Sequence, residues 1–376
     1  MTNRSSANEV VTFGGRDAGV PGTGGHRVAD HTFRLRLVTP VYDDWESFRL
    51  LLQELDKFAA TSSFRIFVTA VNDGSIESPD SVLNDISEPS HLYGAEILHL
   101  SVNVGHQRAI AIGLCVASQD DSADAVLIMD ADGEDPPEAI ALLTQGIGEE
   151  SDFCFVAQRQ KRTEKLSFKL SYMVYKAAFR LVTGKKISFG NFSVFSRGFV
   201  RRLVMVSDLW NNLPAAALRS RLPIKEIPID RGKRYTGKSK MNFTSLIVHG
   251  LSGISVYADT IFVRLLLLTI FLVVLAFGSI SLVFVLRLFF PAHATPGWAT
   301  TVTFGMVIIL LQVLFTTLSS ILMLLNNRVQ RLVVPIKDYV PYVDYREMLF
   351  GSRFPASKGA VSENALGKRE ALAGIL

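Results

Sequence analysis

The stretch LIMDADGEDPPE, residues 127–138, is the most informative part of this chain about its fold. An apolar run ends abruptly at Asp130 and Asp132, and the Pro-Pro-Glu that follows suits the first turn of a helix. Two carboxylates one residue apart at a strand end can share one hard cation, and oxygen ligands select Mg²⁺ or Mn²⁺. The stretch therefore predicts a strand that ends in a metal site held by Asp130 and Asp132. The alternative is a solvated acidic turn.

On both sides of this stretch, short β-type runs alternate with helix-like segments. This alternation predicts an α/β domain with a Rossmann-like, mostly parallel sheet. Ligands of such sheets bind at the carboxyl ends of the strands, so the chemistry is expected just after residues 39, 71 and 130. The expected strands are FRLRLVT (33–39), FRIFVTAV (64–71), AEILHL (95–100), AVLIMD (125–130), DFCFVA (152–157), FSVF (192–195) and IKEIPID (224–230), with helices near 44–60, 104–118, 137–148 and 163–183.

The C-terminal third contains two long apolar segments, 265–286 and 298–325, and neither has a charged residue. Each is long enough to span a bilayer of about 30 Å, and the short link 287–297 makes them a hairpin. Basic residues flank both outer ends, so the positive-inside rule places these ends and the α/β domain in the cytoplasm. These residues are Arg264 before the first segment and Arg328, Arg331 and Lys337 after the second.

The segment 242–259, NFTSLIVHGLSGISVYAD, has apolar residues along one helical face. It predicts a helix that lies in the membrane interface, and the alternative is a domain helix buried against the sheet. The expected organisation is a flexible N-terminal tail (1–32), an α/β domain (33–240), the interfacial helix (241–259), two transmembrane helices (within 260–330) and a cytoplasmic C-terminal tail (331–376). That last tail is a candidate arm for self-association into a homo-oligomer.

Two further motifs follow predicted strands. In VNDGS (71–75), Asp73 can accept hydrogen bonds from a nucleotide base, although the same residues also form ordinary turns. In NVGHQRAIAIGL (103–114), Gly105 lets the backbone approach a ligand, and the start of the helix offers free N–H groups to an anion. His106 is a candidate phosphate contact or, equally, a surface residue at the helix start.

Composition and missing motifs narrow the function classes. Hydrophobic residues make up 48% of the chain and charged residues 20%, which fits a membrane protein better than a disordered or disulfide-stabilised one. The net charge of +4 does not call for a nucleic-acid partner. ATPase, zinc-protease and α/β-hydrolase motifs are absent from the sequence. The basic residues Arg159, Arg162, Arg234 and Lys240 form a candidate phosphate-binding group, unless they are simply solvated.

Together these motifs resemble the inverting family 2 glycosyltransferases with a GT-A fold, and within them the polyprenyl-phosphate sugar transferases. The resemblance covers roughly 34–330, and the matches follow the family's order along the chain. TPVYDD (39–44) is similar to P-x-Y-N-E, VNDGS to D-D-G-S, NVGHQRA to N-x-G-x-x-x-A, DADGEDPPE to D-A-D-x-Q-D-P-P-E, Arg159 and Arg162 to R-x-x-R, GNFSVFSR (190–197) to G-D-F-R-x-x-S-R, and RYTGKSKM (234–241) to R-x-x-G-x-S-K.

The resemblance implies an enzyme that transfers a sugar from a UDP- or GDP-sugar to undecaprenyl or dolichyl phosphate, with Mg²⁺ or Mn²⁺. It implies integration in a membrane, most simply the bacterial inner membrane. The implied catalytic residues are Asp132, Asp135, Arg159 and Arg162, and the implied metal ligands are Asp130 and Asp132. Implied nucleotide-sugar contacts are Pro40, Tyr42, Asp44, Asp73, Asn103, Gly105, Gln107 and Asp130, and implied acceptor or diphosphate contacts are Arg159, Arg162, Asn191, Arg234, Ser239 and Lys240.

The chain departs from the family pattern at three places, and the third keeps another lipid acceptor open. Asp44 stands where the family often has Glu, Asn72 where it often has Asp, and Asn191-Phe-Ser replaces Asp-Phe-Arg. The last change bears on the acceptor more than on the donor. A hydroxyl acceptor such as a diacylglycerol would need a carboxylate base, for which Asp132 and Asp135 are candidates. A third interpretation is a non-catalytic membrane partner that binds nucleotide-sugars.

Overall fold

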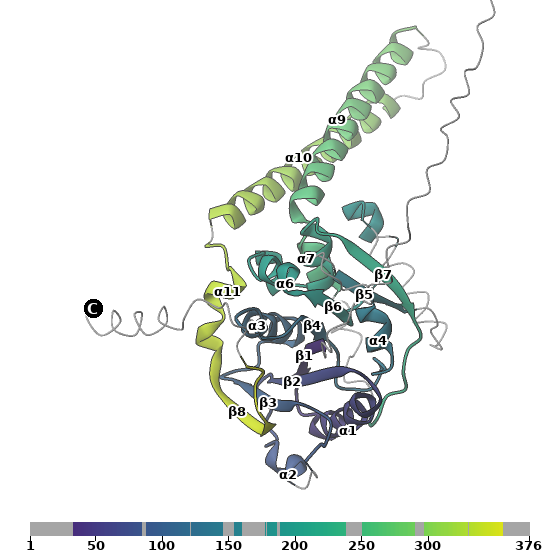
Figure 1. Cartoon of the computed structure of the whole chain (residues 1–376). Helices are drawn as coiled ribbons and strands as arrows, with labels where there is room; N and C mark the ends of the chain where they lie inside the picture. The colour runs from purple at the N-terminus through teal and green to yellow at the C-terminus, as the bar shows by residue number, and fades with distance from the viewer. Residues whose placement is uncertain are drawn as a thin grey trace, which may run out of the picture. The chain divides into compact units, whose positions relative to one another are not determined.

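The computed structural model describes residues 33–84, 88–120, 122–145, 154–159, 177, 179–185, 189–237, 250–289, 297–329 and 331–355. Eight strands form one sheet in the order β7-β5-β6-β4-β1-β2-β3-β8 (Figure 1). Each β-type run predicted from the sequence overlaps one strand, and β8 was not predicted. The strands are β1 (Phe33–Val41), β2 (Phe64–Asn72), β3 (Gly94–Leu100), β4 (Ala125–Ile128), β5 (Cys154–Arg159), β6 (Ser193–Ser196), β7 (Ile224–Ile229) and β8 (Val343–Gly351).

The strand directions bring the motifs to one edge of the sheet. β1 pairs in parallel with β2 and β4, and β2 pairs in parallel with β3. β6 runs antiparallel to both β4 and β5, so β5 and its parallel partner β7 share the direction of β4. The loops after β1, β2, β4, β5 and β7, together with the loop before β6, therefore meet at the same edge. The mostly parallel sheet confirms the predicted fold class.

Apolar residues on alternate positions of the strands pack on opposite faces of the sheet. Leu37 and Leu127 belong to one buried cluster, and their neighbours Val38 and Ile128 belong to the other. Both faces are covered, which is why the strand sequences are almost continuously apolar. One face carries α1 (Trp45–Thr61) and α4 (Ala139–Thr144), and the other carries α3 (His106–Ser118), α6 (Arg197–Leu203), the 3-10 helix η1 (Ser207–Trp210) and α7 (Leu213–Arg219).

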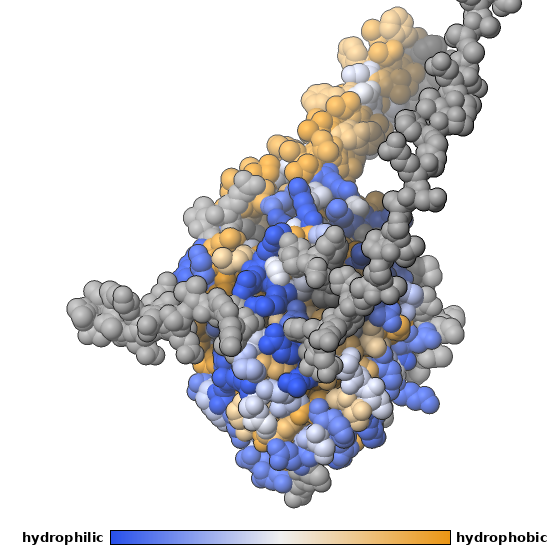
Figure 2. Space-filling view, in the orientation of Figure 1, coloured by the Kyte–Doolittle hydropathy of each residue, from blue (hydrophilic) through white to orange (hydrophobic). Residues whose placement is uncertain are grey.

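Two long helices, α9 (Ala258–Phe289) and α10 (Trp298–Val329), follow the sheet domain. Both are long and apolar enough to cross a membrane, and both extend beyond the predicted segments. They lie side by side, and the hydroxyls of Thr269 and Thr317 are 2.7 Å apart between them. Figure 2 shows hydrophobic side chains over this hairpin, whereas polar side chains dominate the described surface of the sheet domain in that view.

The described end of the segment predicted to be interfacial, from Gly250 to the start of α9, packs on the domain. Val256 and Tyr257 are buried in a cluster with Phe179 and Ala215. Leu251, by contrast, is exposed. Residues 238–249 lie outside the described ranges, so the interfacial helix remains a prediction.

The chain beyond the hairpin returns to the sheet, which differs from the tail expected over 331–376. α11 (Pro335–Asp338) and the 3-10 helix η3 (Val340–Tyr342) lead into β8, which pairs antiparallel with β3. Arg353, just after β8, donates to the buried carboxylate of Glu96 at 2.6 Å. Glu96 also pairs with the buried Arg36 of β1. Residues 343–353 are therefore part of the domain's packing and charge balance.

Candidate active site

The loop after β4 is a tight acidic turn that the chain's own amides shape. The amide of Asp130 donates to Asp135 Oδ2 at 3.1 Å, and the amide of Glu134 donates to Asp132 Oδ1 at 3.0 Å. Asp135 is buried, whereas the side chains of Asp130 and Asp132 remain 27% and 19% exposed. This arrangement favours a turn-shaping role for Asp135, and it leaves the carboxylates of Asp130 and Asp132 at the surface of the site.

The segment after β7 crosses this acidic turn. The amide of Gly232 donates to the Glu134 carbonyl at 2.9 Å, and that of Tyr235 donates to the Asp132 carbonyl at 2.8 Å. Arg231 forms an ion pair with the Glu134 carboxylate. The close approach requires glycine at 133, where φ is +86° and a Cβ atom would lie 2.8 Å from the Lys233 carbonyl oxygen.

Arg234 in the same segment joins the ends of β1 and β4. Its Nη1 lies 2.9 Å from Asp132 Oδ2, and its Nη2 lies 3.6 Å from Asp44 Oδ2. Burial and then the charge of Asp130 raise the pKa of Asp132, although the guanidinium of Arg234 opposes this shift. Burial and nearby carboxylates likewise raise the pKa of Tyr235 to about 12. The site is therefore rich in negative charge, and Arg231 and Arg234 already pair with two of its carboxylates.

The start of α3 and the loop before β6 meet at Asp130. Asn191 Nδ2 lies 3.0 Å from His106 Nε2, and the same His106 nitrogen lies 3.4 Å from Asp130 Oδ1. Gln107 Nε2 donates to Asn191 Oδ1 at 3.0 Å, and the amide of Leu213 donates to Gln107 Oε1 at 2.8 Å. The Asn191 departure from the family pattern therefore lies directly beside the predicted metal site and the start of α3.

Asp73 holds two loops together. The amides of Val104 and Gly105 donate to its two carboxylate oxygens at 2.7 and 3.0 Å. Burial raises the pKa of Asp73, although these two bonds oppose the shift. The turn at Gly74 is packed against the same loop, since φ is +66° and a Cβ would lie 2.6 Å from the Asn103 amide nitrogen. Each carboxylate oxygen of Asp73 retains further acceptor capacity, so a base contact is compatible with these bonds.

Asp43 is a residue of this site that the motif analysis missed. Its Oδ1 accepts from the amides of Ile76 and Glu77 at 2.8 and 3.1 Å, and its own amide donates to Ser75 Oγ at 3.0 Å. Its φ of +46° is unusual for a residue other than glycine. In the sequence, Asp43 is marked only as one of two acidic residues directly after the first strand, and the resemblance to the family points to Asp44 alone.

The other predicted site residues are placed less fully. Pro40 is buried at the end of β1, Tyr42 is 41% exposed just beyond it, and Asn103 is exposed before α3. The backbone of Arg159 ends β5 at the same sheet edge. Arg162, Ser239 and Lys240 lie outside the described residues.

The donor set fits a divalent cation that shares its ligands with a substrate. Within the described ranges, no group of three or more His, Cys, Asp or Glu residues is placed to hold a metal ion by itself. Mg²⁺, however, is commonly bound by one or two carboxylates together with substrate phosphates. A cation between Asp130 and Asp132 would offset the repulsion that raises the pKa of Asp132. The residues present therefore fit the predicted metal.

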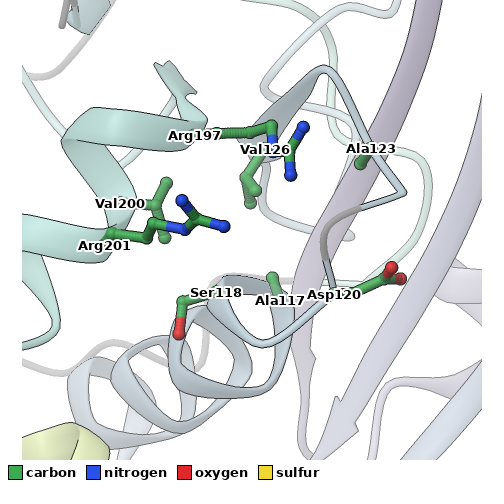
Figure 3. Close-up of a pocket in the computed structure, with 8 residues that line it drawn as sticks. All are labelled: Ala117, Ser118, Asp120, Ala123, Val126, Arg197, Val200 and Arg201. Carbon is green, nitrogen blue, oxygen red and sulfur yellow. The ribbon is translucent and has the colours of Figure 1, made fainter. Parts of the chain in front are cut away.

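A small pocket lies at the opposite edge of the sheet and is separate from this site. It is lined by the end of α3, the start of β4 and residues of α6. Figure 3 shows Arg197 and Arg201 extending from α6 toward this space. His106 begins α3 at the candidate site, whereas Ser118 ends α3 at the pocket. The length of α3 along the sheet therefore separates the two.

Comparison with known proteins identifies relatives of this chain. Residues 37–205 match the model of glycosyl transferase family 2. The chain is 27% identical to an undecaprenyl-phosphate 4-deoxy-4-formamido-L-arabinose transferase of Klebsiella pneumoniae (strain 342), over 71% of this chain and 79% of that protein. It is 24% identical to the prophage bactoprenol glucosyl transferase homolog of Escherichia coli (strain K12), over 60% of this chain and 72% of that protein.

Solved structures show a weaker similarity. The chain is 12% identical to glucosyl-3-phosphoglycerate synthase from Mycobacterium tuberculosis, with a TM-score of 0.43 over 61% of this chain and 80% of that chain. The family match, in contrast, spans β1 to α6 and includes the acidic turn, the Asp73 turn and the start of α3. The chain is therefore a glycosyltransferase, with a match to glycosyl transferase family 2 over residues 37–205.

Proposed function

We propose that this glycosyltransferase moves a sugar from a UDP- or GDP-sugar to a polyprenyl phosphate at the cytoplasmic face of a bacterial inner membrane. One observation carries the proposal. A single sheet edge brings together the acidic turn, the start of α3, Asn191 and Arg234, and two helices able to cross a membrane follow in the same chain. The activities for which the two relatives are named support the acceptor class.

The donor would bind where the loops after β1, β2 and β4 converge. Its base would lie near Pro40, Tyr42 and Asp73, and its diphosphate would lie against the start of α3 and beside Asp130. The free N–H groups of the helix start favour the diphosphate's charge. A divalent cation held by Asp130 and Asp132, either Mg²⁺ or Mn²⁺, would offset the charge that develops on the leaving nucleoside diphosphate.

The reaction needs positioning more than proton transfer. An oxygen of the lipid phosphate would attack the anomeric carbon in line, and the bond from that carbon to the donor's diphosphate would break with inversion. A phosphate monoester is ionised at pH 7, since its second pKa is about 6. No carboxylate base is then required, in agreement with the engagement of Asp135 in the turn. Arg234 would meet the phosphates, together with Arg159, Arg162, Ser239 and Lys240.

The lipid acceptor would reach the site from the membrane surface. Arg264 near the start of α9, and Arg328, Arg331 and Lys337 near and beyond the end of α10, favour a cytoplasmic location for both ends of the hairpin. The sheet domain would then lie on the side where nucleotide-sugars are made. Segment 241–259 is proposed as the interfacial helix that adjoins the entry of the lipid.

The test is transfer by the purified full chain in detergent or lipid vesicles. A panel of UDP- and GDP-sugars is supplied with Mg²⁺ or Mn²⁺ and with undecaprenyl phosphate, undecaprenol or a diacylglycerol. We expect nucleoside diphosphate release only with undecaprenyl phosphate, and a product lipid whose sugar is released by mild acid. Undecaprenol is the matched control because it differs only in the phosphate. Transfer to the diacylglycerol instead would overturn the acceptor and direct attention to Asn191.

A further inference from the structure

The strand that follows the membrane hairpin reaches the donor side of the site through three side chains. Glu347 of β8 lies with its Oε2 at 3.1 Å from His99 Nε2 on β3. His99 Nδ1 lies 3.1 Å from Asn72 Nδ2 at the end of β2. Asn72 Oδ1 accepts from the amide of Ser75 at 2.9 Å. The chain of contacts thus runs from the sheet's outermost strand into the turn that contains Asp73.

Hydrogen-bond chemistry sets the direction of each contact. A backbone amide only donates, so the Asn72 atom that meets Ser75 is the carbonyl oxygen. The Asn72 amide nitrogen therefore faces His99 and donates to its Nδ1. The proton of a neutral His99 is then on Nε2, which donates to the Glu347 carboxylate. Every member of the chain is satisfied in one arrangement.

Packing holds this arrangement in place. Asn72 and His99 are buried register partners on β2 and β3, and His99 is the register partner of Tyr345 on β8. The His99 and Tyr345 rings stack with centroids 4.2 Å apart and planes 12° apart. Glu347, two residues along β8, lies diagonally across from His99, where long side chains on neighbouring strands can meet.

This chain of contacts also accounts for Asn72, where the family pattern often has Asp. A carboxylate at 72 would need a proton on Nδ1 of His99, so a neutral His99 could no longer also donate from Nε2 to Glu347. Asparagine supplies the donor that Nδ1 needs and keeps the acceptor for Ser75. The departure at 72 and the histidine at 99 are therefore matched.

We propose that Glu347 and His99 are positioning residues for the nucleotide-sugar, because they hold the Asn72–Ser75 turn that presents Asp73. β8, the strand beyond the membrane hairpin, then helps to position the donor. This inference rests on the proposed function, in which the donor's base lies near Asp73. The two residues act through Asn72 and do not themselves touch the substrate.

The test compares variants that break the contacts with variants that keep them. Glu347→Leu and His99→Phe remove the hydrogen bonds, and phenylalanine keeps the stack on Tyr345. Glu347→Gln keeps an acceptor for His99, and His99→Gln keeps a donor for Glu347. Both variants should therefore restore the behaviour of the wild type. Asp344→Leu is the matched control, since Asp344 is an exposed carboxylate on the same strand with no bond to His99 among the described contacts.

Two measurements distinguish a failure of the positioning role of Glu347 and His99 from a failure of the proposed transfer reaction. The first is hydrogen exchange of the Ser75, Val104 and Gly105 amides without substrate, and we expect it to rise about fivefold to tenfold in Glu347→Leu and His99→Phe. The second is donor kinetics, where the same two variants should raise KM about fivefold to tenfold with kcat within about twofold of wild type.

Unchanged exchange and unchanged KM in Glu347→Leu, relative to Asp344→Leu, would overturn the positioning role. Glu347 is 41% exposed, so this variant tests the role even where His99→Phe does not fold. If the wild-type chain turned over no nucleotide-sugar, the proposed function would fail. The exchange readout would still decide whether β8 holds the turn.

Discussion

At the scale of single residues, Asp132 joins the acidic turn to the segment after β7. Its backbone carbonyl accepts a hydrogen bond from the Tyr235 amide. Its carboxylate Oδ1 accepts from the Glu134 amide, and its Oδ2 accepts from the guanidinium of Arg234. It shares the turn with Asp130, whose charge contributes to its raised pKa. Asp132 therefore organises the loop after β7, and in the proposed mechanism it also holds the metal ion.

We predict that Asp132→Asn lowers kcat by about a hundredfold or more, because charge on the leaving diphosphate would no longer be offset. The measurement is sugar transfer across a range of Mn²⁺ concentrations, up to saturation. Asp208→Asn is the matched control, since Asp208 has a raised pKa, is 18% exposed and pairs with Arg219 at 3.2 Å away from the site. Full turnover of Asp132→Asn in saturating metal would remove Asp132 from the mechanism.

Motif spacing identified Asp130, Asp132, Asp73 and Arg234 as site residues, and the structure brings these residues to one sheet edge. It did not identify Asp43, because the amides that bond to its side chain lie 33 and 34 residues away in the sequence, where no local pattern links them to it. Nor did it distinguish the partly exposed Asp132 from the buried Asp135, since both are acidic residues of the same turn.

At the scale of elements, the acidic turn and the loop after β7 behave as one unit. Two backbone hydrogen bonds and the ion pair of Arg231 with Glu134 join them. They pack at Gly133, where no side chain fits between the two segments. The conformation of one segment thus decides where Arg234 of the other can lie.

We predict that Gly133→Ala lowers kcat/KM by more than about tenfold, because the new Cβ would displace Lys233 and Tyr235 and move Arg234 from Asp132. Left-handed backbone strain alone is of order 1 kcal/mol. Gly297→Ala isolates that strain, since φ there is +89° and nothing lies within 4 Å of its Cβ. Equal activity in the two variants would show that the packing at Gly133 is unimportant.

At the scale of the whole molecule, the hairpin interrupts a domain that is completed afterwards. β8 covers the edge of β3, and Arg353 supplies a second cation to the fully buried Glu96. Without this segment, β3 would expose an unpaired edge, and Arg36 would be the one ion-pair partner left to Glu96 among the described residues. The sheet domain therefore depends on residues that lie beyond both candidate membrane helices.

We predict that deletion of 343–376 lowers the free energy of unfolding of the sheet domain by about 3 kcal/mol, because the buried Glu96 loses a charged hydrogen-bond partner and β3 loses its pairing strand. Deletion of 356–376 removes none of the described contacts and should leave stability unchanged. Thermal or denaturant unfolding of the two truncated chains in the same detergent measures the difference. Equal stability would mean that β8 and Arg353 contribute little.

Local patterns in the chain were enough to predict the strand–helix order, the acidic turn at the end of β4 and the two apolar helices. Hydrophobic periodicity and strand-end motifs depend on neighbours along the chain, so they can be read without the folded structure. The folded structure was needed to establish that 343–351 is a strand, that Asn191 meets His106, and that Glu347 reaches Asn72 through His99. These contacts join residues far apart in sequence, and strand pairing is set by packing and register, which no short pattern records.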